Sequence, residues 1–269
     1  MPKRIIGVLE VKLIDMKSLL TRIKAASPSL YYCGLGHLAL FVLLVVVAQV
    51  DQRQLLGISI WIKPIKFAIS ISVYCLTWPL LLQYLPAEAI KKRFANFTVF
   101  AMTFEMIAIG SQAARGALSH FNNSSPYNAL LFSLMGIVIV SQTLYALYMG
   151  LQFFKVKAER LSPALLWAIR LGTLMAAVFA LEGGIMASRL AHTVGVADGG
   201  PGIPLLNWST IAGDLRVAHF MGLHALQVVP LFVIFSRTRK PRPVVIFSLL
   251  YFVLVSLLFC NAMLGRPVF

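Results

Sequence analysis

Acidic and histidine side chains stand inside otherwise apolar stretches of this sequence. Glu105 and Glu182 each interrupt a long hydrophobic run, and His219 and His224 interrupt another, which begins at Asp214. A charged group in the hydrocarbon of a membrane is costly, so such residues usually face a protein interior and serve a function. We therefore predict that Glu105, Glu182 and Asp214 take part in catalysis or proton transfer.

Three histidines are candidate ligands of a metal ion. His120 follows one apolar run, and His219 and His224 lie within a later one. Neutral imidazole is the commonest transition-metal ligand, and together with the glutamates it would give mixed nitrogen and oxygen coordination suited to zinc or iron. A b-type haem is the other cofactor that such histidines could hold. The structural alternative is that each histidine only donates a hydrogen bond between helices.

A further group of polar residues, most of them basic, could bind a substrate. Cationic side chains at the mouth of a cavity attract anions, and amides add hydrogen bonds. The ligand would be a small anionic solute, a lipid phosphate or the propionates of a haem. The candidates are Lys63, Lys66, Gln112, Arg115, Arg189, Arg216, Gln227 and Asn261.

The composition indicates that a lipid bilayer surrounds these residues. Of the 269 residues, 59% are hydrophobic and 12% are charged, and the mean hydropathy is +0.84. These values exclude a soluble, disordered, collagen-like or disulfide-stapled chain. Runs of about 20 apolar residues, the length that crosses a bilayer, predict an all-α bundle of seven transmembrane helices. The predicted spans are 29–50, 66–85, 94–114, 128–154, 164–190, 214–236 and 244–263.

The distribution of basic residues predicts the orientation of this bundle. Lys and Arg number 24 against 9 Asp and Glu. In a soluble protein this excess would suggest nucleic acid, but here the basic residues concentrate in alternate segments, before residue 28 and at 91–93, 155–160 and 237–242. Cytoplasmic loops are enriched in Lys and Arg. We expect the N-terminus inside and the C-terminus outside, as in a bacterial inner membrane, with lipids and no nucleic acid as partners.

The first 28 residues predict an amphipathic helix ahead of the single transmembrane domain, residues 29–269. Apolar residues recur there at intervals of three or four, which places them on one helical face. The helix either lies on the anionic inner surface of the membrane or docks beneath the bundle. The residues of this face are Ile5, Leu9, Leu13, Met16, Leu20 and Ile23.

The segment 55–67 on the predicted outer side is too apolar for a free loop. Pro64 interrupts it, so we expect an interfacial or re-entrant piece that carries Lys63 and Lys66 to the mouth of the second span.

The stretch 191–213 on the same side is rich in Gly and Pro, which predicts a shaped cap over the outer mouth. At its end Asp214, or Thr210 a turn earlier, is also a candidate N-cap of the sixth span.

Given this orientation, most of the intramembrane polar residues lie in the outer half of the bundle, and we expect them to form one outward-facing pocket.

No HExxH, GxSxG or P-loop motif occurs, and the three cysteines have no CxxC spacing, so they indicate neither a disulfide framework nor a zinc knuckle. Two functions follow. The first is a metal- or haem-dependent membrane enzyme or redox protein, and the alternative is a transporter or receptor for a small anionic or proton-coupled solute. A subunit whose polar residues contact another membrane protein is a third.

Overall fold

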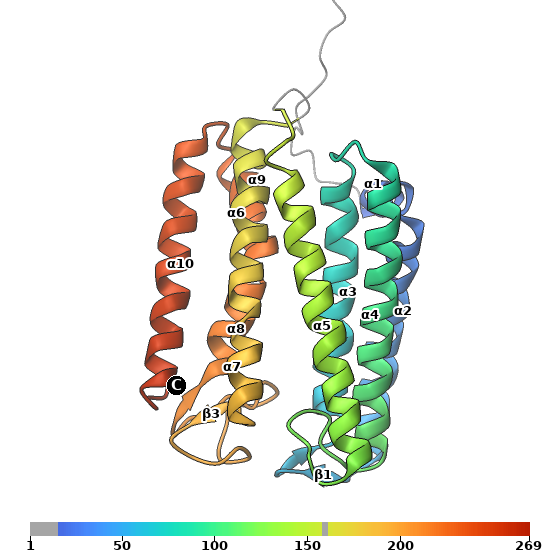
Figure 1. Cartoon of the computed structure of the whole chain (residues 1–269), viewed down its shortest axis with the longest axis vertical. Coiled ribbons are helices and arrows are strands. Elements are labelled where there is room, and N and C mark those ends of the chain that lie inside the picture. Colours follow the sequence, from blue (N-terminus) through green and yellow to red (C-terminus); the bar gives the residue numbers. More distant parts are fainter. Residues whose placement is uncertain (1–15, 158–160) are drawn as a thin grey trace, which may run out of the picture.

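Six helices are long and apolar enough to cross a membrane in the computed structural model, which describes residues 16–157 and 161–269. They confirm the all-α class, and each overlaps a span that the sequence predicts (Figure 1). One of the six is interrupted at Leu181. The helices are α2 (Pro28–Val50), α3 (Ile62–Leu82), α4 (Glu88–Ala114), α5 (Pro126–Gln152), α6 followed by α7 (Pro163–Ala180 and Glu182–Arg189) and α10 (Pro241–Met263).

The remaining apolar stretch is two helices, and not the continuous span 214–236 that the sequence predicts. α8 (Leu215–Leu223) and α9 (Ala225–Ser236) meet at His224 with a bend of 51° between them. Pro230, within α9, has no N–H to donate to the preceding turn. Broken helices leave backbone groups free inside a bundle, and this is common at the binding sites of membrane transporters.

Two short antiparallel strand pairs lie at one end of the bundle. β1 (Gln54–Leu55) pairs with β2 (Ile58–Ser59), and β3 (Thr193–Val194) pairs with β4 (Gly213–Asp214). We call this the strand end, and we call the opposite end, which carries α1 (Met16–Ala26), the α1 end (Figure 1).

Of the two forms predicted for the segment before α3, interfacial or re-entrant, the re-entrant one is not found, because the segment is a hairpin that leads directly into α3. Leu56 and Gly57 both have positive φ, as in the type I′ turn that favours a tight hairpin. α3 then begins at Ile62, and Pro64 lies in its first turn, where a missing N–H costs nothing. Lys63 and Lys66 are therefore part of the helix.

The described part of the N-terminal segment docks against the bundle. α1 packs on α2 and α3, and its Ile23 is buried. Arg22 Nη2 donates to Gln83 Oε1 at 3.4 Å. This arrangement matches the docked alternative for residues 16–26. The predicted amphipathic positions before Met16 lie outside the described residues.

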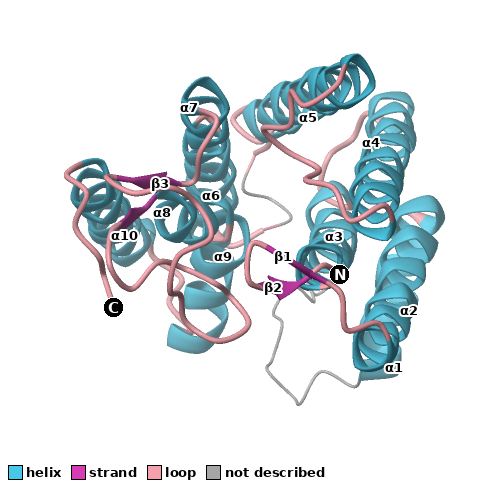
Figure 2. Ribbon diagram, turned by 90° about the horizontal axis from the view of Figure 1, so that it is seen from below, coloured by secondary structure: helices cyan, strands magenta, loops and turns pink. Residues whose placement is uncertain are grey.

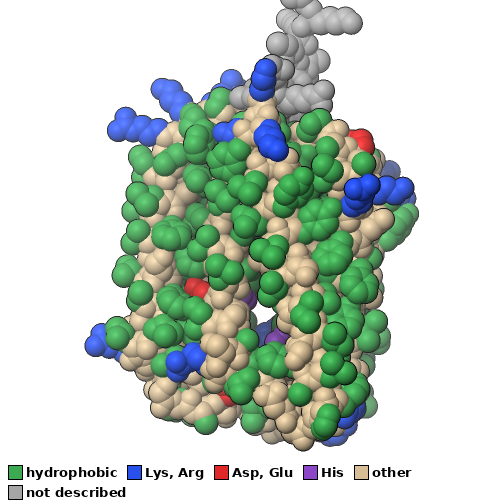
Figure 3. Space-filling model, viewed as in Figure 1, with side chains coloured by type: hydrophobic (Ala, Val, Ile, Leu, Met, Phe, Trp, Pro, Cys, Tyr) green, Lys and Arg blue, Asp and Glu red, His purple; other side chains and the backbone are tan. Residues whose placement is uncertain are grey.

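The helices form two groups that lie side by side, α1 to α5 and α6 to α10 (Figures 1 and 2). α5 and α6 contact each other near the α1 end of α5, where a Cβ on Gly150 would lie 2.9 Å from the Cβ of Thr173. Arg170 Nε on α6 donates to the carbonyl oxygen of Phe153 at 3.0 Å. Toward the strand end, Figure 3 shows an opening between α5 and α6, with histidine and basic side chains at its edge.

Large apolar side chains cover the outside of the described helices (Figure 3). Ile137 and Leu144 on α5 and Leu250 and Leu257 on α10 are all exposed. A water-soluble monomer rarely exposes so extensive an apolar surface, whereas lipid chains solvate it readily. The surface is consistent with an integral membrane protein.

Candidate functional site

The first two turns of α3 carry two lysines into the region between the helix groups. Lys66 Nζ donates to the carbonyl oxygen of Leu206 at 2.9 Å, which ties α3 to the segment before α8. Lys63 is half-buried and has no hydrogen bond or ion pair among the described residues. Its ammonium lies within electrostatic range of the charges of Lys66, Arg216, Asp198 and Glu105. Lys63 is thus a cation held in place by its helix and left without a direct partner.

Glu105 brings a carboxyl group into the same region from α4. Its side chain is 3% exposed, and its Oε1 has no hydrogen-bond partner in the described part of the chain. The charge of Lys63 acts on it, but the two groups do not form an ion pair. A buried polar atom without a partner is unusual and commonly marks a functional site. α3 and α4 therefore bring an amine and a carboxyl group within electrostatic range of each other without a direct ion pair.

Asp214 anchors the start of α8. It is the helix N-cap, as the sequence predicts, because its Oδ1 accepts from the backbone N–H of Arg216 at 3.0 Å. Its Oδ2 accepts from the backbone N–H of Ser209 at 2.8 Å. The Arg216 guanidinium donates to both oxygens, at 2.9 and 2.6 Å, and to the carbonyl oxygen of Asn207. Because both of its oxygens already accept hydrogen bonds, Asp214 holds the Arg216 guanidinium in position.

His120 turns inward from the segment between α4 and α5. Its ring packs against Phe67 of α3 and Phe132 of α5, with centroids 5.9 and 6.1 Å apart. Ser119 Oγ lies 3.1 Å from its Nδ1. Burial lowers the pKa of His120 well below its usual value, and the charges of Lys63 and His192 lower this pKa further. The imidazole is therefore neutral at pH 7, and it lies beside Lys63.

Sequence reasoning missed a second histidine at this place, His192, and its partner Asp198. Nδ1 of His192 donates to Asp198 Oδ2 at 2.6 Å. Burial would raise the pKa of Asp198, but hydrogen bonds from His192 and Thr193 outweigh it and hold this pKa below its usual range. Burial lowers the pKa of His192 and outweighs the opposing effect of Asp198. Asp198 could have been found because it lies in a glycine-rich stretch, where aspartate side chains commonly accept hydrogen bonds from nearby backbone N–H groups and so stabilise a turn.

The segment 191–213 joins the two helix groups at the strand end. The ring of His192 packs on Phe121 with centroids 4.7 Å apart. A Cβ on Gly199 would lie 3.0 Å from the Cβ of Leu56 in the β1–β2 turn. Together with the bond from Lys66, these contacts place the segment across both groups, as expected of a cap.

The three histidines predicted as metal ligands do not form one metal site. His219 Nδ1 donates to the carbonyl oxygen of Phe179 at the end of α6, at 3.0 Å. His224 lies at the bend between α8 and α9, with its ring 4.4 Å from that of Phe220. In residues 16–157 and 161–269, no three His, Cys, Asp or Glu side chains are placed to hold one metal ion.

Three of the predicted binding residues make local hydrogen bonds, and a fourth is exposed. Gln112 Nε2 donates to Asn128 Oδ1 at 2.9 Å, and Arg115 Nη1 donates to Gln112 Oε1 at 2.7 Å, so this pair fixes the turn between α4 and α5. Asn261 Nδ2 donates to the carbonyl oxygen of Arg266 at 2.9 Å. Arg189 is exposed at the end of α7.

Gln227, predicted to bind substrate, and Glu182, predicted to be catalytic, lie near the ends of helices in the second group. Gln227 of α9 donates to Thr77 Oγ1 of α3 at 3.2 Å, which joins the two groups at the bent helix. Glu182 is the first residue of α7 and is 5% exposed, and its Oε2 has no hydrogen-bond partner among the residues described. The next residue, Gly183, lies against the His219 ring.

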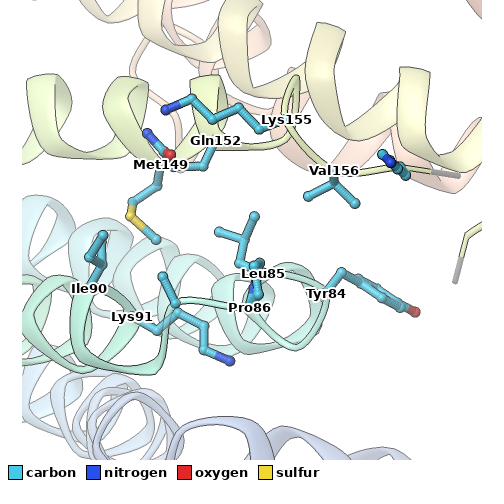
Figure 4. A pocket seen from close by; sticks show the side chains of 11 residues that line it. Tyr84, Leu85, Pro86, Ile90, Lys91, Met149, Gln152, Lys155 and Val156 are labelled. Atoms are coloured by element: carbon cyan, nitrogen blue, oxygen red, sulfur yellow. The ribbon is translucent and has the colours of Figure 1, made fainter. Parts of the chain in front are cut away.

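A separate pocket of about 300 Å³ lies at the α1 end, between the end of α3 with the start of α4 and the end of α5 (Figure 4). Lys91, Lys155 and Lys157 are among the residues that line it. Lys91 pairs with Glu88. These lysines belong to the basic segments that are predicted from the sequence to be cytoplasmic, and none of the candidate site residues lines this pocket.

Comparisons with protein-family models, with curated proteins and with solved structures find no match to this chain.

Proposed function

We propose that this protein is a transporter or receptor that binds a small anionic solute at the strand end, between its two helix groups. The observation that carries the proposal is the half-buried ammonium of Lys63, which has no direct partner in the described chain. An ammonium held away from bulk water gains most from an anionic ligand. A carboxylate or phosphate group would bind Lys63, with Lys66 adding to the positive field, whereas the charge of Arg216 is already paired with Asp214.

Glu105 supports coupling of this binding to a proton. Its buried carboxyl lies within electrostatic range of Lys63, so its protonation state alters the charge that an incoming anion meets. Buried carboxyl groups and histidines serve as proton relays in membrane transporters. A protonated Glu105 would favour the anion, and an ionised Glu105 would compete with it.

The broken helices also support transport. α8 and α9 meet at His224 with a bend of 51°, and in the same helix group the single residue Leu181 separates α6 from α7. Substrate sites of secondary transporters commonly form where membrane helices are discontinuous. An enzyme with a metal ion held by His120, His219 and His224 has less support, because these side chains do not form one metal site among the described residues.

The proposed topology places the strand end outside. If the bent pair of α8 and α9 crosses as one span, the chain crosses seven times and ends at the strand end, where Figure 1 places the C-terminus. Basic residues gather at the α1 end, including Lys92, Arg93 and Lys155, which supports a cytoplasmic α1 end facing anionic lipids. A bacterial inner membrane with the pocket open to the periplasm accommodates this arrangement.

Thermal unfolding in detergent with different anions tests the binding proposal. Inorganic phosphate or malonate should raise the Tm saturably above the effect of chloride at equal ionic strength. At 100 times the Kd of the anion, the free energy of unfolding should be about 2.7 kcal/mol higher. Lys63→Met should abolish this stabilisation. Lys92→Met, an exposed lysine at the α1 end, is the matched control and should retain it. Equal stabilisation by chloride, or equal loss in both variants, would refute the proposal.

A further inference from the structure

Two cysteines of neighbouring helices lie side by side, away from the proposed anion site at Lys63. The sulfur atoms of Cys33 on α2 and Cys75 on α3 are 3.6 Å apart. The two helices approach closely here, as shown by Gly34, where an added Cβ would lie only 2.7 Å from the Cγ of Leu76. Disulfide formation requires two backbones that are already close, and a small side-chain rotation then brings the sulfurs into bonding distance.

The surroundings of Cys33 favour its reactive form. Its sulfur accepts from Cys75 Sγ and lies 3.6 Å from His37 Nδ1. His37 Nδ1 is also 2.8 Å from the carbonyl oxygen of Cys33, and because a carbonyl only accepts, this nitrogen carries the proton. Donors that point at a sulfur stabilise the thiolate, which is the nucleophile in thiol chemistry. Cys33 is therefore the attacking thiol, and the fully buried Cys75 is the resolving one.

A groove connects Cys33 with the outside of the bundle. It has a volume of about 460 Å³, lies between α2 and α4, and contains both Cys33 and His37. Its walls are mostly apolar, with Leu40, Met106 and Ile107 among them. In the proposed topology this groove opens toward hydrocarbon, so the molecule that reaches the thiols must be soluble in lipid.

We propose that Cys33 and Cys75 are a redox-active dithiol that a lipid-soluble quinone oxidises to a disulfide. The Cys33 thiolate adds to a ring carbon of the quinone and forms a carbon–sulfur bond. Cys75 sulfur then attacks Cys33 sulfur, the carbon–sulfur bond breaks, and its electron pair leaves with the ring. The two thiol protons complete the hydroquinone. The dithiol loses two electrons and two protons, which is what a quinone takes up on reduction.

The experiment adds decylubiquinone to the reduced full-length protein in nanodiscs and follows hydroquinone formation and free thiols. We expect one hydroquinone per chain and a peptide linked through Cys33 and Cys75 in the mass spectrum. Cys260→Ser is the matched control, because Cys260 is an exposed cysteine on α10, and it should leave the yield unchanged. Cys33→Ser and Cys75→Ser should each abolish the cross-link. His37→Gln should slow the reaction about tenfold without lowering the yield, since the thiolate fraction falls.

Two results would overturn the proposal. One is a protein that retains both thiols after treatment with the quinone. The other is cross-linking by copper phenanthroline but not by the quinone, which would show that the two thiols are close neighbours without this redox function. Unchanged unfolding temperatures of the serine variants would establish that any loss reflects chemistry and not misfolding.

Discussion

Glu105 is the buried acid on which proton coupling in the proposed site depends. Its Oε1 has no partner among the described side chains and backbone groups. Removing the charge relieves a desolvation cost, so Glu105→Gln should fold normally and raise the free energy of unfolding by about 1 kcal/mol. Anion binding by this variant should lose its pH dependence. Thermal unfolding with malonate at several pH values measures both effects.

The matched control is Glu88→Gln, which removes an exposed acid at the α1 end and should leave the pH dependence intact. A Glu105→Gln variant that binds malonate with the wild-type pH profile would make Glu105 a structural residue.

His120 gives the folded protein a pH dependence that is independent of any ligand. Its pKa in the folded state lies well below the usual value because the ring is buried beside Lys63 and His192. In the unfolded chain the His120 imidazole binds a proton at about pH 6.5, whereas in the folded chain it binds one only at lower pH. Stability is therefore fully present above about pH 6.5 and is lost as the pH falls toward the folded pKa.

The variant His120→Phe tests this effect, since its ring can occupy the aromatic surroundings that Phe67, Phe121 and Phe132 provide. Its Tm should fall less than that of the wild type between about pH 7 and pH 5, because one proton-binding group has been removed. Part of the loss should remain, because burial lowers the pKa of His192 as well. An identical fall in both proteins would show that His120 does not contribute.

At the scale of elements, the start of α8 depends on one carboxylate. Asp214 caps the helix and also holds the backbone N–H of Ser209 and the guanidinium of Arg216. Asp214→Ala removes all these acceptors and should lower the free energy of unfolding by about 2 to 4 kcal/mol. Protease cleavage within the segment 191–213 should become faster, because this segment loses its attachment to α8.

Thr210→Ala is the appropriate comparison, since the sequence offers Thr210 as the other candidate cap. Its hydroxyl is exposed to solvent and donates only to the carbonyl oxygen of Pro201, at 3.3 Å. We expect a change in unfolding free energy within about 0.5 kcal/mol. Equal destabilisation by the two substitutions would show that the capping bond contributes little.

At the scale of the whole molecule, hydropathy predicts the helices but not their grouping. The apolar runs locate six membrane-length helices because the bilayer imposes a length and a composition on each. Which helices pack together depends on close approaches that the runs do not encode, such as Gly150 against Thr173. The bend at His224 was missed for a related reason, since the stretch 214–236 remains apolar across the break.

The candidate site was only partly predictable for similar reasons. Lys63, Glu105 and Arg216 were recognisable because charged residues in apolar runs are costly in a membrane and usually face the protein interior. His192 and Asp198 were missed because a loop gives no periodic pattern to place their side chains. The pairing of Cys33 with Cys75 is invisible in the sequence because it depends on the packing of α2 against α3.

The central claim is that Lys63 lines an anion-binding pocket open at the outer, strand end of the protein. Labelling of Lys63→Cys by a membrane-impermeant sulfonated maleimide in intact cells, with the native cysteines replaced by serine, tests it most directly. We predict labelling from outside, whereas Gln83→Cys at the α1 end should react only after permeabilisation. If Lys63→Cys reacts only after permeabilisation, or only when the protein is unfolded, the pocket does not open where we place it.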